Sequence, residues 1–273
     1  MARPLRIELA GAFYHVMARG NARQSIFKDA RDREAFLRGV QRVCERCHWR
    51  IWAYCLMDNH YHLLTETLEP TLSRGMREIN GLYTQGFNRR HQRVGHVLQG
   101  RYKALLVDQD VYLLEVSRYI VLNPVNAGVC RAAGDYKWSN YRATLGREAA
   151  PAWLAVADTL RLFSTDKRRA REAYRRFVAK GVGAPDPTTQ AQGQCFLGDE
   201  HFITKVTRHL KRPSREVPKS QRAWKTLSTY ERETRDRNAA IRTAYASGSY
   251  TLGQIGQHFN LHYATVSRIA RNG

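Results

Sequence analysis

The 273-residue sequence predicts an α+β fold: a ferredoxin-like or RRM-like antiparallel sheet with helices on one face, followed by an all-helical C-terminal region. Three observations lead to this prediction. In the first half, short β-rich segments alternate with segments of helical periodicity. Two of the β-rich segments are separated only by the turn-forming pair Asp58-Asn59. The second half shows helical periodicity throughout.

Four segments of the first half are predicted strands, because each is short and rich in aromatic and β-branched residues. These segments are residues 13–19, 49–57, 60–67 and 102–107. We expect the second and third to form a hairpin, since only the Asp58-Asn59 turn separates them.

Helices are predicted where apolar residues recur every three or four positions. In the first half these segments are residues 29–48, 71–91 and 111–122. The third is expected to stop before Pro124, because the residue before a proline avoids the α region. The order of elements is therefore β-α-β-β-α-β-α. In the second half the predicted helical segments are 151–180, 199–210, 223–245 and a compact pair near the C-terminus.

Composition suggests how the chain divides into parts. Residues 181–193 are rich in Gly, Pro and Thr, which is typical of a linker. The predicted parts are an α+β domain at 1–148, a helical extension at 149–182, a linker at 183–198, and a basic helical region at 199–273 that ends in a pair of short helices at about 250–271.

The charge of the chain is strongly positive. Lys and Arg number 45 against 24 Asp and Glu, a formal net charge of +21. An excess this large indicates a polyanionic partner, with nucleic acid the first candidate. No apolar run is long enough for a membrane span, the segment 1–12 lacks the apolar core of a secretory signal, and five cysteines do not suggest a disulfide framework. We therefore expect a cytoplasmic protein with no membrane partner.

The sequence His60-Tyr61-His62 stands on a predicted strand. Side chains at i and i+2 of a strand point to the same face, so the two imidazoles lie side by side. Two imidazoles on one face form half of a divalent-metal site. Two polar residues on the solvated face of a sheet are the alternative.

Tyr119 and Asn123 are four residues apart on a predicted helix, so they share one face. A phenol beside a carboxamide suggests a nucleophile with an auxiliary metal ligand, although a packed aromatic near a helix end is the simpler alternative. Between the two motifs, residues 96–103 mix cations with an aromatic side chain, as single-strand binding segments do. Gln99, Arg101 and Lys103 are candidates for phosphate contacts and Tyr102 for base stacking; a charged loop that leads into a strand is the alternative.

Together these motifs resemble those of the HUH-type single-tyrosine transposases, and within them the REP-associated branch. The matching stretches occur in the family order and cover about residues 1–145. They are residues 20–21 with 26–27, 52–64, 95–103, 112–128 and 138–141. The chain departs from the family pattern at Asp58, where a proline is usual.

The resemblance implies a mechanism. His60 and His62, assisted by Asn123, would bind one Mg²⁺ or Mn²⁺. The metal would polarise the scissile phosphate of single-stranded DNA at a hairpin, and Tyr119 would attack that phosphate to give a 5′-phosphotyrosine and a free 3′-OH. Attack by another 3′-OH would then join strands. The resemblance also suggests a bacterial, DNA-associated protein with no small-molecule substrate, and a monomer is slightly favoured over a homodimer.

The C-terminal segment 251–271 reads as two short helices joined by a turn at Asn260-Leu261. It resembles the C-terminal DNA-binding helices of the replication initiator DnaA; an ordinary helical hairpin is the alternative. The expected groove-facing residues are His262, Tyr263, Thr265, Ser267 and Arg268.

Further DNA contacts are expected in the first half. These candidates are Arg19, Asn21, Arg23, Arg89, Arg90 and Arg118. Two other functions stay open: a non-catalytic regulator that binds hairpin DNA, and a metal-dependent RNA nuclease, which would have no need of Tyr119. The haem-attachment pattern at residues 44–48 is set aside, because attachment requires export and Cys44 continues the apolar face of a helix.

Overall fold

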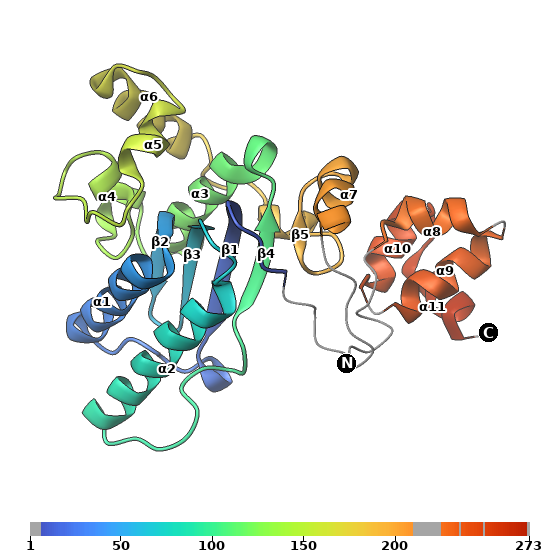
Figure 1. The fold of residues 1–273 in the computed structure, drawn as a ribbon, viewed down its shortest axis with the longest axis horizontal. Coiled ribbons are helices and arrows are strands. Elements are labelled where there is room, and N and C mark those ends of the chain that lie inside the picture. Colours follow the sequence, from blue (N-terminus) through green and yellow to red (C-terminus); the bar gives the residue numbers. More distant parts are fainter. Residues whose placement is uncertain (1–6, 210–224, 235, 248, 272–273) are drawn as a thin grey trace. The chain divides into compact units, whose positions relative to one another are not determined.

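The computed structural model describes residues 7–209, 225–234, 236–247 and 249–271. Contacts divide the chain into two compact units (Figure 1). One comprises Glu8–Thr189; the other comprises Gln190–Gly273 with Met1–Ile7. The boundary between the two units falls between residues 189 and 190, inside the segment 183–198 that was predicted as a linker.

The first unit is built on an antiparallel sheet in the order β2-β3-β1-β4. Its strands are β1 (Ala12–Arg19), β2 (Trp49–Met57), β3 (His60–Thr67) and β4 (Lys103–Val107). All four predicted strands are present, and β2 and β3 form the predicted hairpin. The register of β1 against β3 places Arg19 opposite His60 and Met17 opposite His62.

Two helices, α1 (Ala30–Cys47) and α2 (Leu72–Arg90), cover one face of the sheet. Tyr61 of β3 points to this face, where its ring centroid lies 4.6 Å from that of Phe36 on α1 and its hydroxyl donates to Asn80 on α2 at 2.7 Å. The Asp29 carboxylate caps α1 by accepting from the Asp32 amide. The α+β prediction is confirmed, with these two helices on one face as expected.

A third helix, α3 (Gln109–Asn126), covers the opposite face. His60 and His62 alternate with Tyr61 along β3, and both contact Asn123 on α3. The prediction of helices on one face alone was therefore incomplete. The physical reason is burial on both sides of the strand: Tyr61 is 0% exposed and His62 is 5% exposed, so each face needs a covering layer.

The predicted end of this helix before Pro124 was wrong, because α3 continues through Pro124 to Asn126. The proline stands in the last turn, so its missing N–H removes only one hydrogen bond, the one that would reach Ile120. Burial of Val121, Leu122 and Pro124 outweighs the local bias against a helical residue before proline. The continuation keeps Asn123 on the helix, one turn after Tyr119.

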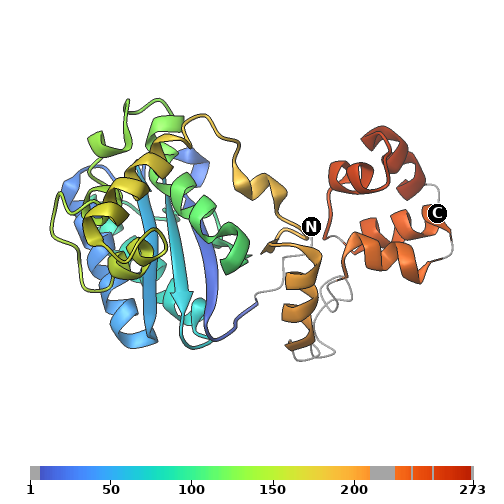
Figure 2. The same ribbon diagram turned by 90° about the horizontal axis from the view of Figure 1, so that it is seen from above.

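The rest of the first unit is a helical extension packed on α3 (Figure 2). It contains α4 (Tyr141–Thr144), α5 (Val156–Arg161) and α6 (Lys167–Ala179), with 3-10 turns at Asn21–Arg23, Ala133–Asp135 and Pro187–Gln190 elsewhere in the chain. Tyr174 and Val178 of α6 share a buried cluster with Val121 and Leu122 of α3. The single helix expected over 151–180 is two helices, and Asp166 caps the second by accepting from the Arg169 amide.

The second unit is helical apart from the two-residue strand β5 (Phe196–Leu197), which the all-helical prediction omitted. Its helices are α7 (Glu200–His209), α8 (Leu227–Glu233), α9 (Arg237–Ala246), α10 (Leu252–His258) and α11 (Tyr263–Arg271). The predicted helix over 223–245 is divided into α8 and α9, because Asp236 caps a new helix. The predicted proline-broken basic segment 211–222 lies outside the described residues.

The last two helices, α10 and α11, are the two short helices predicted for segment 251–271. The Thr251 hydroxyl accepts from the Gln254 amide and begins α10 with a capping box. Asn260 adopts a left-handed conformation (φ 53°) in the turn that follows. Ile255 and Val266 join the buried core of the unit. Across the described part of the chain, no helix is both long and apolar enough to cross a membrane.

Candidate active site

Two imidazoles and a carboxamide converge on the α3 face of the sheet. The Nε2 atom of His60 lies 3.2 Å from Asn123 Oδ1, and the Nε2 atom of His62 lies 3.4 Å from Asn123 Nδ2. The strand places both imidazoles on this face, and the helical continuation through Pro124 places the carboxamide above them. The structure therefore brings together the three residues predicted as metal ligands.

The other ring nitrogen of each imidazole has a partner that orients it. His60 Nδ1 lies 2.6 Å from Asn59 Oδ1, and His62 Nδ1 lies 2.9 Å from His15 Nε2. Such hydrogen bonds at one nitrogen fix the tautomer and leave the other nitrogen for a metal. We assign the His60 proton to Nδ1, because the contact with Asn59 is the shorter of its two.

This assignment makes the donor set suitable for a cation. A neutral His60 with its proton on Nδ1 turns the lone pair of Nε2 toward the Asn123 carbonyl oxygen, 3.2 Å away. Two acceptor atoms facing each other repel unless a cation or proton lies between them. Imidazole nitrogen and amide oxygen are both ligands for Mn²⁺, and oxygen ligands suit Mg²⁺. The three residues thus fit a single divalent ion.

Burial keeps these imidazoles neutral. It lowers the pKa of His60, and it lowers the pKa of His62 well below its ordinary value, with the neighbouring His15 and His60 adding to the effect. Burial also lowers the pKa of His15 to about 4. A neutral imidazole is the metal-binding form, so the site is prepared for a cation near neutral pH.

Tyr119 lies over the same face. Its ring centroid is 5.8 Å from that of His62 and 6.1 Å from that of His15. The hydroxyl donates to the Asp186 carboxylate at 2.9 Å. Burial, followed by the charge of Asp186 and this hydrogen bond, raises the pKa of Tyr119 above its ordinary value, while the Arg19 cation opposes the rise.

Asp186 is held in place by the segment that follows α6. Its second carboxylate oxygen accepts from the Thr188 amide at 2.8 Å, which fixes the direction of the side chain. The segment returns over α3 at Gly181, where a Cβ atom would lie 2.4 Å from Cδ of Arg118. A side chain at this position would require the Arg118 side chain to shift, so the glycine allows the close approach of the segment to α3.

The basic loop at residues 96–103 is tied to the end of β1 beside His60. The Gln99 amide donates to the Arg19 carbonyl at 2.8 Å, and the Asn21 amide donates to the Val97 carbonyl at 2.9 Å. Gln99, Arg101 and Lys103 are exposed, and Tyr102 is half-buried near Ser73, 3.4 Å from its hydroxyl. The candidates in this loop therefore lie at the edge of the site, together with exposed Arg19.

Other candidates for DNA contacts have structural partners. Arg90 pairs with Asp29 and Asp32, tying α2 to α1. Arg118 pairs with Glu115 and stacks on Phe177 of α6, with its guanidinium carbon 4.5 Å from the ring centroid. These contacts do not support Arg90 and Arg118 as DNA ligands, because other groups hold their guanidinium groups.

The remaining first-unit candidates are exposed but less directly connected to the imidazoles. Arg89 is exposed at the end of α2, and Arg23 is exposed in the turn after β1, where its carbonyl accepts from Asn59 Nδ2 at 3.1 Å. Asp58, the acidic residue in place of the family proline, pairs with Arg33. Its carboxylate is thereby held by α1.

The C-terminal candidates lie in the second unit. His262, Tyr263 and Arg268 are exposed, whereas Thr265 and Ser267 are half-buried. The His262 and Tyr263 rings pack together, with centroids 4.4 Å apart. These positions give α11 and the turn before it an accessible polar and aromatic surface.

No cluster of three or more His, Cys, Asp or Glu side chains arranged for a metal occurs among the residues that the structure describes. The candidate site instead has two histidines and an asparagine. Cys44 and Cys47 are buried free thiols on α1, and burial raises the pKa of both. Neither is a prepared thiolate ligand.

Sequence reasoning missed His15 and Asp186. His15 reads as one more residue of a β-strand, and its contact with His62 depends on the pairing register of β1 with β3. Asp186 lies within the stretch predicted as a linker, 67 residues from Tyr119. Alternation along β1 could have placed His15 on the same face as Arg19, but no local signal marked Asp186.

Part of the chain is similar to a known protein family. Residues 9–123 match the family model described as Transposase IS200 like. This match confirms the resemblance to tyrosine transposases for that part of the chain. No curated protein matches the sequence.

Two solved structures show weaker overall similarity. A REP-associated tyrosine transposase bound to a REP hairpin is 18% identical, covers 57% of this chain and 92% of its own, and has a TM-score of 0.48. A transposase candidate from Deinococcus radiodurans R1 is 15% identical, covers 44% of this chain and 94% of its own, and has a TM-score of 0.31.

Proposed function

We propose that the protein cleaves single-stranded DNA at hairpin sequences and transfers the cut strand, a proposal supported by the match of residues 9–123 to the Transposase IS200 like family model. Tyr119 is the nucleophile, and a 5′-phosphotyrosine is the intermediate. The observation that carries this proposal is the position of the Tyr119 hydroxyl. It lies on the same helix face as Asn123, over two neutral imidazoles, with a carboxylate 2.9 Å away.

His60, His62 and Asn123 would hold one Mg²⁺ or Mn²⁺, as the convergence of their donor atoms supports. Bound there, the ion supplies Lewis-acid polarisation of the scissile phosphate. Asn59 and His15 orient the two imidazoles through their Nδ1 atoms. These two residues therefore act as positioning residues and do not touch the DNA phosphate.

Asp186 accepts the proton of Tyr119 as the phenol oxygen attacks phosphorus. The bond from phosphorus to the 3′ oxygen breaks, and the net reaction moves the phenol proton to the leaving 3′-OH. In the joining step another 3′-OH attacks the phosphotyrosine, and Asp186 takes the proton of that hydroxyl and passes it to the departing phenol oxygen. Because burial and the Asp186 charge hold Tyr119 protonated at rest, the transfer accompanies attack instead of preceding it.

The basic loop at 96–103 and Arg19 are suited to hold the single strand beside the site. Their cations are exposed at the edge where the imidazoles lie. The helix pair α10–α11 supplies further DNA contacts through its exposed residues, as a helix-turn-helix does. These contacts add affinity and selectivity without taking part in the bond-making steps.

The test is a covalent-capture assay. A hairpin oligonucleotide labelled on the 3′ side of the cleavage site is incubated with Mg²⁺ or Mn²⁺ and run on a denaturing protein gel. The wild-type protein should carry the label, and Tyr119→Phe should not, because phenylalanine keeps the ring and removes the attacking oxygen. Tyr112→Phe on the same helix is the matched control and should retain labelling.

Two outcomes would reject the proposal. Cleavage by Tyr119→Phe would mean that water is the nucleophile, as in a metal-dependent RNA or DNA hydrolase. Tight binding of the hairpin with no labelled adduct in any of the three proteins would indicate a regulator without catalytic activity.

A further inference from the structure

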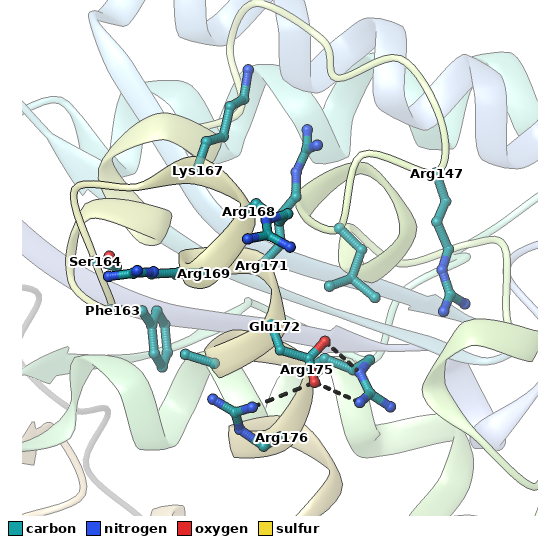
Figure 3. Close-up of a pocket in the computed structure, with 12 residues that line it drawn as sticks. Arg147, Phe163, Ser164, Lys167, Arg168, Arg169, Arg171, Glu172, Arg175 and Arg176 are labelled. Carbon is teal, nitrogen blue, oxygen red and sulfur yellow. Dashed lines mark hydrogen bonds and ion pairs between the residues drawn. The ribbon is translucent and has the colours of Figure 1, made fainter.

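A cationic groove lies on the outer side of α6, in the helical extension beyond the matched segment 9–123. It has a volume of about 1100 Å³ and is lined by seven Lys or Arg side chains and one acidic residue, Glu172. Most of the cations project from α6, and Arg147 reaches in from the loop after α4 (Figure 3). We propose that this groove binds the phosphate backbone of double-stranded DNA.

The charge of the groove is poorly neutralised within the protein. Glu172 is shared by Arg175 and Arg176, with nitrogen–oxygen distances of 2.7 and 3.5 Å. Among the described residues, no carboxylate lies within salt-bridge distance of Lys167 or Arg168. An anionic partner would supply the missing counter-charge.

Like charges are also placed where they repel. Lys167, Arg171 and Arg175 follow at intervals of four residues, so their side chains are neighbours along one helix face. The Nε atom of Arg171 is buried and has no hydrogen-bond partner in the described part of the chain. A Cβ atom at Gly146 would come within 2.2 Å of the Arg171 guanidinium, so the glycine makes room for it. The groove keeps this cation close despite the repulsion.

The groove fits duplex DNA better than a single strand. Single-strand sites combine cations with several aromatic platforms for the bases, whereas this groove has Phe163 as its one aromatic lining residue. A helix of 13 residues spans about 20 Å, and that length of duplex carries about 12 phosphate charges. The guanidinium group suits bidentate contacts with phosphate.

The groove is rigidly joined to the helix that bears the nucleophile. On its inner side, α6 buries Ala170, Tyr174 and Val178 against Val121 and Leu122 of α3. Duplex DNA held on the outer side would therefore have a defined position relative to Tyr119. This inference rests on the proposed function. It assigns the paired stem of the hairpin substrate to the groove on α6.

The test measures binding without cleavage. Affinity for a fluorescent 16-base-pair duplex is measured in full-length protein without divalent metal, over a range of salt concentrations. The variant Lys167→Gln/Arg168→Gln/Arg169→Gln removes three exposed groove charges. We expect an affinity loss of about 10- to 100-fold at 0.15 M salt, and a log K against log salt slope that is shallower by about 2 to 3.

The matched control removes the same number of charges from α1, which covers the other face of the sheet. Its substitutions are Arg31→Gln, Arg38→Gln and Arg42→Gln, all at exposed positions. This control should bind within about threefold of wild type. Glu172→Gln should bind about fivefold more tightly, because the groove gains one net positive charge. Equal losses in both triple variants, or no loss in the groove variant, would overturn the inference.

Failure of the proposed function would appear in a different measurement. A hairpin oligonucleotide containing the cleavage site, at a concentration that saturates both proteins, should give the covalent adduct equally with wild type and the groove variant. If wild type forms no adduct but the duplex measurements behave as expected, the groove assignment stands and the nuclease proposal fails. If the adduct forms but the groove variant binds duplex DNA as tightly as wild type does, the nuclease proposal stands and the groove assignment fails.

Discussion

Two regions of the first unit meet on α3 and differ in every electrostatic respect. Toward the sheet, α3 presents Tyr119 and Asn123 to neutral imidazoles, buried or half-buried, whose pKa values are lowered. Toward α6, it packs against a helix whose outer face carries an exposed excess of guanidinium groups around one carboxylate. The first region is a hydrogen-bonded network, and the second is largely unneutralised charge.

This contrast follows from what each region has to do. A metal ligand needs an imidazole lone pair, so protonation must be disfavoured, and burial achieves this. A DNA-binding surface gains affinity by releasing counterions, so its cations must be exposed and free of internal partners. Substitutions in the two regions should therefore separate cleavage from binding, and the predictions below challenge that separation.

The largest expected effect is complete loss of cleavage in His60→Ala and in His62→Ala. Each change removes one of the two nitrogens that converge on Asn123. Hairpin affinity should stay within about threefold of wild type, because the removed groups are uncharged. Titration calorimetry with Mn²⁺ should show weak or no binding in both variants, with exposed His201→Ala as the control. If either variant cleaves at the wild-type rate in Mg²⁺, the metal binds elsewhere.

A smaller effect is expected from Asp186→Asn. The amide still accepts a hydrogen bond from the Tyr119 hydroxyl but is a poor proton acceptor. The rate of adduct formation should fall by about 10²- to 10⁴-fold at unchanged hairpin affinity, the range typical of general-base catalysis. Asp186→Glu should restore part of the rate. Faster adduct formation by the Asn variant would instead mean that Asp186 restrains the tyrosine, since its charge helps to hold the phenol protonated.

The strands and most helices were predictable because their signals are local. Composition and the Asp58-Asn59 turn marked the hairpin that carries His60 and His62, and helical spacing alone put Tyr119 and Asn123 on one face. The resemblance to a transposase family then joined these two motifs into one site. Their spatial convergence is what the structure adds, with Asn123 between both imidazoles.

The features that sequence could not predict all depend on long-range contacts. His15 meets His62 across 47 residues through strand register, and Asp186 meets Tyr119 across 67 residues from a stretch with linker composition. Pro124 was misread because burial of the last turn of α3 outweighed a local preference. The charges of α6 were visible in the sequence, but a solvated helix face has the same pattern until its packing and ion pairs are known.

The smallest expected effect is a pH dependence of stability that arises from buried His15. His15 is fully buried and its pKa is lowered to about 4, whereas an unfolded histidine titrates near 6.5. Below pH 6.5, His15 therefore binds a proton in the unfolded chain but stays neutral in the folded protein. The stabilising contribution of neutral His15 is complete above pH 6.5 and is lost as the pH falls toward 4.

His15→Gln should remove this dependence, because glutamine can accept from His62 Nδ1 but does not titrate. Between pH 6.5 and 5, the free energy of unfolding of wild type should fall more steeply than that of the variant, by about 1 kcal/mol per pH unit on average. Urea denaturation at several pH values measures both slopes, and exposed His96→Gln provides the control for loss of a histidine. Parallel slopes for wild type and His15→Gln would show that His15 takes up a proton in the folded protein as readily as in the unfolded chain. The imidazoles beneath α3 would then not form the neutral network described above.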